Sequence, residues 1–172
     1  VKVFVCDQEK GWFTVAVEFE GGAAVTTIRM ELPGAAAFPA ALFVASPVVL
    51  FDSGETGGSV LKGFTLTGGT AGGVTCNGSS PTIADCTISG NHAEGLVCWE
   101  GSSPDVADCL ISENSGSGVS CVLGSSPHLR RCRIEANSTS TSGGGVECRI
   151  GCAPVLEECT IRGNEAGECG GG

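Results

Sequence analysis

The chain has 172 residues, 41% of them hydrophobic, which is the length of one domain with enough apolar residues for a core. Its formal net charge is −10, with 9 Lys and Arg against 19 Asp and Glu. This balance argues against a nucleic-acid-binding protein, because such proteins use Lys and Arg to displace phosphate counterions. No apolar run is long enough to span a bilayer as a helix, so we expect no membrane span.

The N-terminal third, residues 1–58, is predicted to form irregular β turns that lead into a repeat, with a separate small β cap as the alternative. The stretch 35–43 is rich in Ala and contains Pro39, which fits either a short helix over the open end of the repeat or an irregular turn. Elsewhere in this third, alternating apolar and polar residues predict short strands. These strands lie at 1–6, 12–20, 25–32 and 48–51.

Residues 59–172 are predicted to be regular repeats of about 23 residues, and the cysteines mark the period. Two cysteines stand ten or eleven residues apart in each of four repeats, and the interval between repeats grows in the last one, which places an insertion at 138–144. The first series is Cys76, Cys98, Cys121 and Cys148, and the second is Cys86, Cys109, Cys132 and Cys159. Such a period is typical of a solenoid whose repeats cover one another's apolar faces.

The repeats have the pattern of short strands. Apolar residues alternate with period two around each cysteine, as in Val74 with Cys76 and Cys86 with Ile88, and no segment has helical spacing. A Pro-containing corner such as Ser79-Ser80-Pro81 separates the strands, because Pro cannot donate to a β ladder. A third inward column follows the corners and consists of Ile83, Val106, Leu129 and Leu156.

Short strands in register from turn to turn predict an all-β fold, a parallel β-helix with irregular N-terminal turns. Neighbouring turns then lie about 4.8 Å apart, so equivalent residues stack. An Asn follows each second cysteine by five residues, and stacked amides can bond both one another and the backbone of a bend. The predicted asparagine ladder, beside the two cysteine ladders, is Asn91, Asn114, Asn137 and Asn164.

Three segments carry a family resemblance: Gly72-Gly73-Val74, Ile88-Ser89-Gly90-Asn91, and VLKGFTLTGG at 60–69, which has Lys62 where the related rung usually has Asp. From about residue 48 onward the chain resembles right-handed parallel β-helix repeat proteins with a pectate-lyase-like fold, and is similar to polymorphic outer-membrane protein repeats. The resemblance implies a right-handed coil and an extracellular or cell-surface location. It leaves the activity open, because this architecture hosts lyases, hydrolases, adhesins and inert shafts.

Eleven cysteines suggest disulfides in an oxidising compartment, but eight of them occupy inward columns where a thiol serves as a small apolar side chain. Stacked cysteines have parallel Cβ vectors, which disfavour a disulfide, so we expect a mostly reduced ladder. Cys152 replaces the first Ser of a corner and is expected to point outward, where a surface disulfide with Cys169 is the best candidate. The spacings do not fit a zinc or iron–sulfur site.

Outward columns supply the candidate chemistry. Stacking places Asp105 beside His128, and Asp108 beside Arg131, and these four residues are the candidates for acid–base work. The simpler interpretation is a solvated face on which stacked opposite charges relieve repulsion. We therefore assign no catalytic residue from the sequence.

Two further sites have weak support. Asp85 and Asp108, one turn apart, are candidates for a shared Ca²⁺, but a calcium site needs six or more oxygens. No other metal or cofactor is predicted.

A flat ice-binding face is disfavoured because Arg133 interrupts the outward column that contains Thr. Asn77, in Asn-Gly-Ser, is an accessible glycosylation acceptor.

The sequence favours a non-catalytic structural or adhesive β-helix segment of a larger surface or extracellular assembly, with protein neighbours or glycans as partners. Its inward residues repeat while its outward residues change from turn to turn, as expected of a shaft. The end at 167–172 reads as the start of another turn, so we expect a piece of a longer chain. The alternative is a polysaccharide lyase or hydrolase that acts on an acidic glycan.

Overall fold

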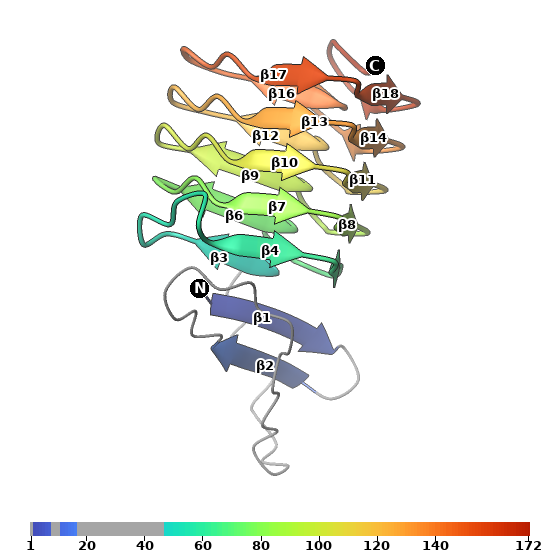
Figure 1. Cartoon of the computed structure of the whole chain (residues 1–172). Helices are drawn as coiled ribbons and strands as arrows, with labels where there is room; N and C mark the ends of the chain where they lie inside the picture. The colour runs from blue at the N-terminus through green and yellow to red at the C-terminus, as the bar shows by residue number, and fades with distance from the viewer. Residues whose placement is uncertain (1, 8–10, 17–46) are drawn as a thin grey trace.

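The computed structural model describes residues 2–7, 11–16 and 47–172, and in these residues all regular structure is β. The chain winds as a coil of stacked turns, and each turn gives one strand to each of three sheets, called A, B and C (Figure 1). Sheets B and C have five strands each, one from every turn. The predicted all-β parallel β-helix is confirmed.

The strands are short because the chain turns a corner after each one. Sheet A contains β1 (Lys2–Asp7), β2 (Gly11–Ala16), β3 (Val49–Phe51), β6 (Val74–Asn77), β9 (Leu96–Trp99), β12 (Val119–Cys121) and β16 (Val146–Cys148). Sheet B contains β4 (Val60–Lys62), β7 (Thr82–Ala84), β10 (Asp105–Ala107), β13 (His128–Arg130) and β17 (Val155–Glu157). Sheet C contains β5 (Thr65–Leu66), β8 (Thr87–Ser89), β11 (Leu110–Ser112), β14 (Arg133–Glu135) and β18 (Thr160–Arg162).

The turns stack in parallel and in the register that the repeat predicts. Cys76 pairs with Cys98, Cys98 with Cys121, and Cys121 with Cys148 in sheet A. In sheet B, Ile83, Val106, Leu129 and Leu156 follow one another in the same way. Because parallel turns pair residue for residue, every inward position forms a continuous column through the coil.

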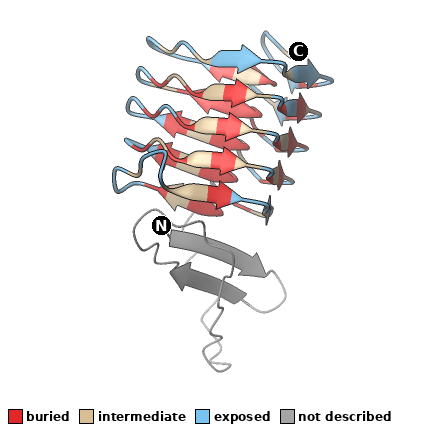
Figure 2. Ribbon diagram, viewed as in Figure 1, coloured by how far each residue is buried: buried red, intermediate tan, exposed pale blue. Residues whose placement is uncertain are grey.

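The core lies inside the coil (Figure 2), where the columns of Val, Leu, Ile and Cys meet. Ile88, Ile111 and Ile134 are completely buried, whereas Ile161 in the last turn is 39% exposed. Cys148 and Cys159 of that turn are also more exposed than their partners, because a neighbouring turn covers them on one side alone. The approach between turns is close: a Cβ on Gly95 would lie 2.5 Å from Ile111 Cγ2.

The predicted asparagine ladder forms at the bend after sheet C. Asn91 Nδ2 donates to Asn114 Oδ1 at 2.8 Å, and Asn114 Nδ2 donates to Asn137 Oδ1 at 2.8 Å. Asn137 Nδ2 continues the ladder to Asn164 Oδ1 at 2.9 Å. The same oxygens accept backbone N–H groups of the preceding turn, as in Asn91 N–H to Asn114 Oδ1 at 3.1 Å. All four side chains are buried, and the amides satisfy the backbone of the bend.

A second polar column, which was not predicted from the sequence, runs through the corner between sheets A and B. Ser79, Ser102 and Ser125 are at most 1% exposed, and the Ser102 and Ser125 hydroxyls donate to carbonyls three residues earlier. Cys152 occupies the next position, and its Sγ donates to Arg149 O at 2.8 Å while the side chain packs against the core. The expectation that Cys152 points outward is therefore wrong, because this corner turns its first residue inward.

The N-terminal strands differ in direction from the coil. β1 pairs antiparallel with β2 and with β3, and β3 then pairs parallel with β6. The strand predicted at 1–6 is confirmed, as is the first part of the strand predicted at 12–20. The strand predicted at 25–32 and the helix or turn at 35–43 lie outside the described residues. The division into domains at residue 58 stays a prediction.

The insertion at 138–144 adds a short extra ladder to one corner of the coil. β15 (Ser138–Thr139) pairs parallel with β19 (Glu165–Ala166). Gly143, near the end of the insertion, lies against Glu147, whose Cβ would be 2.7 Å from a Cβ built on Gly143. Glu147 is only 8% exposed although it points away from the core, and it accepts a hydrogen bond from Arg149 Nη2 at 2.7 Å.

Candidate functional site

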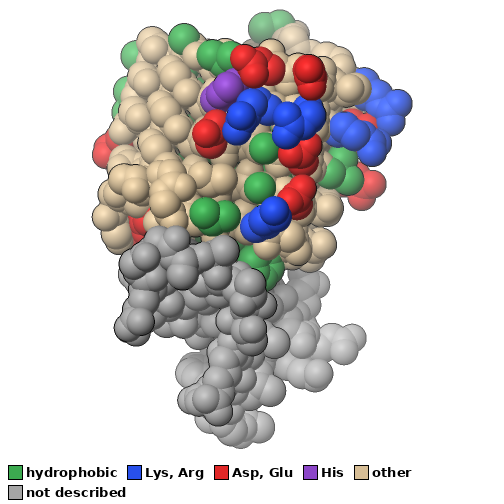
Figure 3. Space-filling model, in the orientation of Figure 1, with side chains coloured by type: hydrophobic (Ala, Val, Ile, Leu, Met, Phe, Trp, Pro, Cys, Tyr) green, Lys and Arg blue, Asp and Glu red, His purple; other side chains and the backbone are tan. Residues whose placement is uncertain are grey.

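On the face of the molecule that Figure 3 shows, charged side chains gather over sheet B and the turn that follows it, and others lie over sheet C. The first and third residues of each sheet B strand point outward while the second enters the core, as the burial pattern of β10 and β13 shows. Asp105 therefore stacks directly on His128, as predicted. Asp108 and Arg131 each directly follow the last residue of a sheet B strand, in the turn between sheets B and C.

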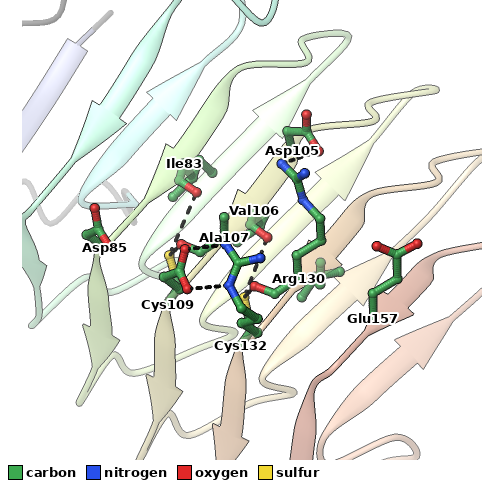
Figure 4. Close-up of polar contacts among 12 residues, drawn as sticks. Ile83, Asp85, Asp105, Val106, Ala107, Cys109, Arg130, Cys132 and Glu157 are labelled. Carbon is green, nitrogen blue, oxygen red and sulfur yellow. Dashed lines mark hydrogen bonds and ion pairs between the residues drawn. The ribbon is translucent and has the colours of Figure 1, made fainter.

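His128 lies between carboxylates of the two neighbouring turns. Its Nδ1 is 3.5 Å from Asp105 Oδ1, and its Nε2 is 3.1 Å from Glu157 Oε2. Arg130, on the same strand as His128, extends its guanidinium toward Asp105, with Nη2 3.6 Å from Oδ1 (Figure 4). Within the described residues, His128 Nε2 and Arg130 Nε are buried without a hydrogen-bond partner, although Glu157 Oε2 lies near the imidazole.

Sequence reasoning missed Arg130 and Glu157. Both belong to a third outward column, which starts with Lys62 and continues through Ala84 and Ala107. The signal was present as the position two residues after His128, because alternate residues of a strand share a face. Two alanines in the middle of the column made it resemble an ordinary surface.

Asp108 and Arg131 form a separate pair. Arg131 Nε donates to Asp108 Oδ1 at 2.8 Å, and Arg131 Nη2 donates to Oδ2 at 2.7 Å. These hydrogen bonds hold the pKa of Asp108 below its usual range and raise the pKa of Arg131. Both residues have positive φ, 54° and 52°, so the turn itself directs them outward. The four candidates thus form two pairs, Asp105 with His128 and Asp108 with Arg131.

The calcium candidates have other partners. Asp85 Oδ2 lies 3.2 Å from Lys62 Nζ, and both oxygens of Asp108 accept from Arg131. Among residues 2–7, 11–16 and 47–172, no three His, Cys, Asp or Glu side chains are grouped as metal ligands. Since a calcium ion needs six or more oxygens, the geometry does not favour Ca²⁺ at Asp85 and Asp108.

The stacked cysteines of residues 47–172 are free thiols. Burial raises the pKa of Cys76, which keeps that sulfur protonated and apolar. In the second series, the interaction with the neighbouring Cys109 thiol lowers the pKa of Cys86 and that of Cys132 to about 7. Cys86 N–H also donates to Cys109 Sγ at 3.4 Å.

The predicted disulfide between Cys152 and Cys169 does not form in the structure, where both are free. Cys152 lies at the corner between sheets A and B, whereas Cys169 Sγ is 3.3 Å from Ser142 Oγ at the corner of the insertion. Because these are different corners of the coil, the two thiols do not face each other.

The glycosylation candidate Asn77 is exposed at the end of β6. The hydroxyl of Ser79, the third residue of its acceptor motif, is turned inward and donates to Glu55 Oε2 at 2.9 Å. Asn137, which matches the same motif, is completely buried in the ladder. The structure therefore exposes the Asn77 amide and encloses that of Asn137.

A family model for the right-handed β-helix region matches residues 48–171. The chain belongs to the right-handed β-helix family. The match begins just before β3, so it covers the whole parallel coil and fixes its hand. No curated protein and no solved structure matched the chain. The described residues contain no helix long and apolar enough to cross a membrane.

Proposed function

We propose that the chain is a non-catalytic structural or adhesive β-helix segment of a larger extracellular or cell-surface assembly, in which it contacts protein neighbours or glycans. One observation carries the proposal: the candidate catalytic groups pair with one another between turns. Arg131 holds both oxygens of Asp108, and His128 lies between two carboxylates. Such contacts join neighbouring turns, and both oxygens of Asp108 are occupied by Arg131, so this carboxylate is not free to serve as a base.

The rest of the coil supports a shaft. Hydrogen-bonded asparagines, buried serines and apolar columns each connect one turn to the next, so stiffness accumulates along the axis. The outward residues differ from turn to turn, which suits broad contacts along the length more than one repeated ligand site. An extracellular or surface location is part of the proposal and follows from the family resemblance.

The alternative is a polysaccharide lyase or hydrolase for acidic glycans. One observation favours it: His128 Nε2 and Arg130 Nε are buried and without hydrogen bonds within the described residues, next to Asp105 and Glu157. Unsatisfied nitrogens beside carboxylates are a feature of sites that bind an anionic or hydroxyl-rich ligand. A cleavage assay distinguishes the two functions.

The first prediction concerns turnover. The purified chain, incubated with a panel of uronate-containing and neutral glycans, is expected to release no reducing ends or unsaturated products above a heat-denatured control. The variants Asp108→Asn and His128→Ala are expected to match it. Cleavage of any one glycan that disappears in either variant would show that the enzyme assignment is the correct one. Binding of intact glycan without cleavage supports the adhesive form of the proposal.

A further inference from the structure

Three of the large hydrophobic side chains that the described residues leave exposed lie at one corner of the coil, between sheets A and B. They are Trp99, 44% exposed, Leu123, 41%, and Ile150, 73%. Each belongs to a different turn, and the three turns are consecutive. With the half-buried Val122 they form what we call the corner stripe: Trp99, Val122, Leu123 and Ile150.

Backbone hydrogen bonds between turns hold the stripe in place. Val122 N–H donates to Cys98 O at 2.9 Å, which stacks Val122 on Trp99. Leu123 O and Ile150 O each accept an N–H from the turn before, at 3.0 Å, which stacks Ile150 on Leu123. Because these bonds continue the parallel register, the side chains form two adjacent columns that follow the long axis.

The backbone of the stripe is strained. Leu123 has φ of 52° and Ile150 has φ of 41°, in the left-handed region that favours Gly, Asn or Asp. A β-branched residue such as Ile is disfavoured there, and both side chains point toward solvent instead of filling the core. Folding alone favours Gly at these positions, so the apolar side chains are better explained by a contact outside the coil.

Opposite charges stand at the two ends of the stripe. Glu100 follows Trp99 in the first of the three turns, and Arg149 precedes Ile150 in the last. Arg149 Nη2 bonds to Glu147 Oε1 at 2.7 Å, which fixes the guanidinium while 54% of the side chain stays exposed. The corner stripe is therefore acidic and aromatic at one end, aliphatic in the middle, and basic at the other end.

We propose that the corner stripe is a two-fold contact between two copies of this chain, with the coils antiparallel and the axis crossing Val122 and Leu123. In this arrangement the two aliphatic residues meet their own counterparts. Arg149 of the second copy lies over Trp99 and beside Glu100 of the first, and the reverse contact forms at the other end. A cation–π contact and an ion pair thus occur twice, which makes the patch self-complementary.

The contact is expected to be weak. Four side chains per copy cover less than the roughly 800 Å² per partner of a standard-size interface. The dimer is therefore expected at micromolar or higher concentrations, as between neighbours in an assembly. The inference rests on the proposed assembly role, but the tests are separate, because glycan cleavage and dimerisation are measured independently.

Sedimentation velocity of the full chain over a concentration series tests the contact. We expect a monomer–dimer equilibrium, and we expect Leu123→Asp to raise its dissociation constant at least tenfold because it places two carboxylates at the axis. Glu100→Lys, which places a second cation beside Arg149 of the second copy, is expected to raise it severalfold. Val155→Asp, at a 49% exposed position on sheet B, is the matched control and is expected to leave it unchanged.

Glycine variants separate contact from folding. Ile150→Gly and Leu123→Gly remove the side chains and relieve the positive φ, so we expect the melting temperature to stay equal or rise while dimerisation is lost. A structural role for these side chains predicts the opposite, a lower melting temperature. A chain that is monomeric at every concentration, or one whose dimer survives both Leu123→Asp and Ile150→Gly, overturns the proposal.

Discussion

Asparagine suits the bend after sheet C because one short side chain meets two needs. Asn114 Oδ1 accepts both the backbone N–H and the Nδ2 of Asn91, at 3.1 and 2.8 Å. Its own Nδ2 donates to Ile88 O at 3.1 Å and to the next amide, Asn137, at 2.8 Å. An aspartate would lack the donors, and a serine has one donor instead of two. The residue type follows from the number of backbone groups at the bend.

We predict that Asn114→Ala destabilises the chain by about 3 kcal/mol, because it removes side-chain bonds on two sides and leaves buried groups of Asn91 unpaired. Asn77→Ala is the control, since Asn77 is exposed and its replacement is expected to change stability by less than about 0.5 kcal/mol. Urea unfolding followed by circular dichroism measures both. Equal effects of the two substitutions would contradict the role of the ladder.

At the scale of strands, the outward charges of sheet B and its following loop alternate in sign over the last three turns of the coil. β10 and the loop after it supply Asp105 and Asp108. In the next turn of the coil, β13 and the loop after it supply Arg130 and Arg131, and β17 then supplies Glu157. The inward columns are nearly identical from turn to turn, so they accept a strand shifted by one whole turn almost equally well. Such a shift would bring carboxylates against carboxylates. The alternating charges therefore favour the observed order of turns.

Acid is expected to weaken these contacts. Hydrogen bonds from Arg131 and from Arg162 hold the pKa values of Asp108 and Glu135, respectively, below the usual range. A carboxyl group whose folded pKa is lowered contributes stability above its unfolded pKa, about 4, and loses it as the pH falls through the folded value. We predict that the urea midpoint declines below about pH 4.5, and that the Asp108→Asn, Glu135→Gln double variant declines less steeply. Parallel pH curves would contradict this explanation.

The sequence predicts well which residues stack on one another, and predicts poorly which groups a long side chain contacts outside its own column. Period alone placed Cys98 on Cys121 and Asp105 on His128, because parallel pairing translates spacing directly into neighbours. It did not reveal that Arg130 extends across a turn to Asp105, since a long side chain contacts groups outside its own column. Cys152 was misjudged for another reason: a Ser at that corner looks solvent-facing in sequence, although the backbone turns it inward.

At the scale of the molecule, the coil is a one-dimensional stack in which each turn touches only its neighbours. The stability of a residue then depends on whether turns cover it on both sides. Ile111 has covering turns above and below and is completely buried, whereas Ile161, in the same sheet C column, is 39% exposed. Chemically identical positions in the repeat are therefore expected to differ in energy along the axis.

We predict that Ile111→Ala costs about 3 kcal/mol of unfolding free energy, since it leaves a cavity between two turns, and that Ile161→Ala costs about 1 kcal/mol. The two substitutions remove the same atoms from equivalent sites, so each is the control for the other. Urea unfolding monitored by circular dichroism gives the free energies, and hydrogen exchange locates the loosened turn. If the two variants unfold at the same midpoint, stability is not governed by coverage from neighbouring turns, because only the number of covering turns distinguishes the sites.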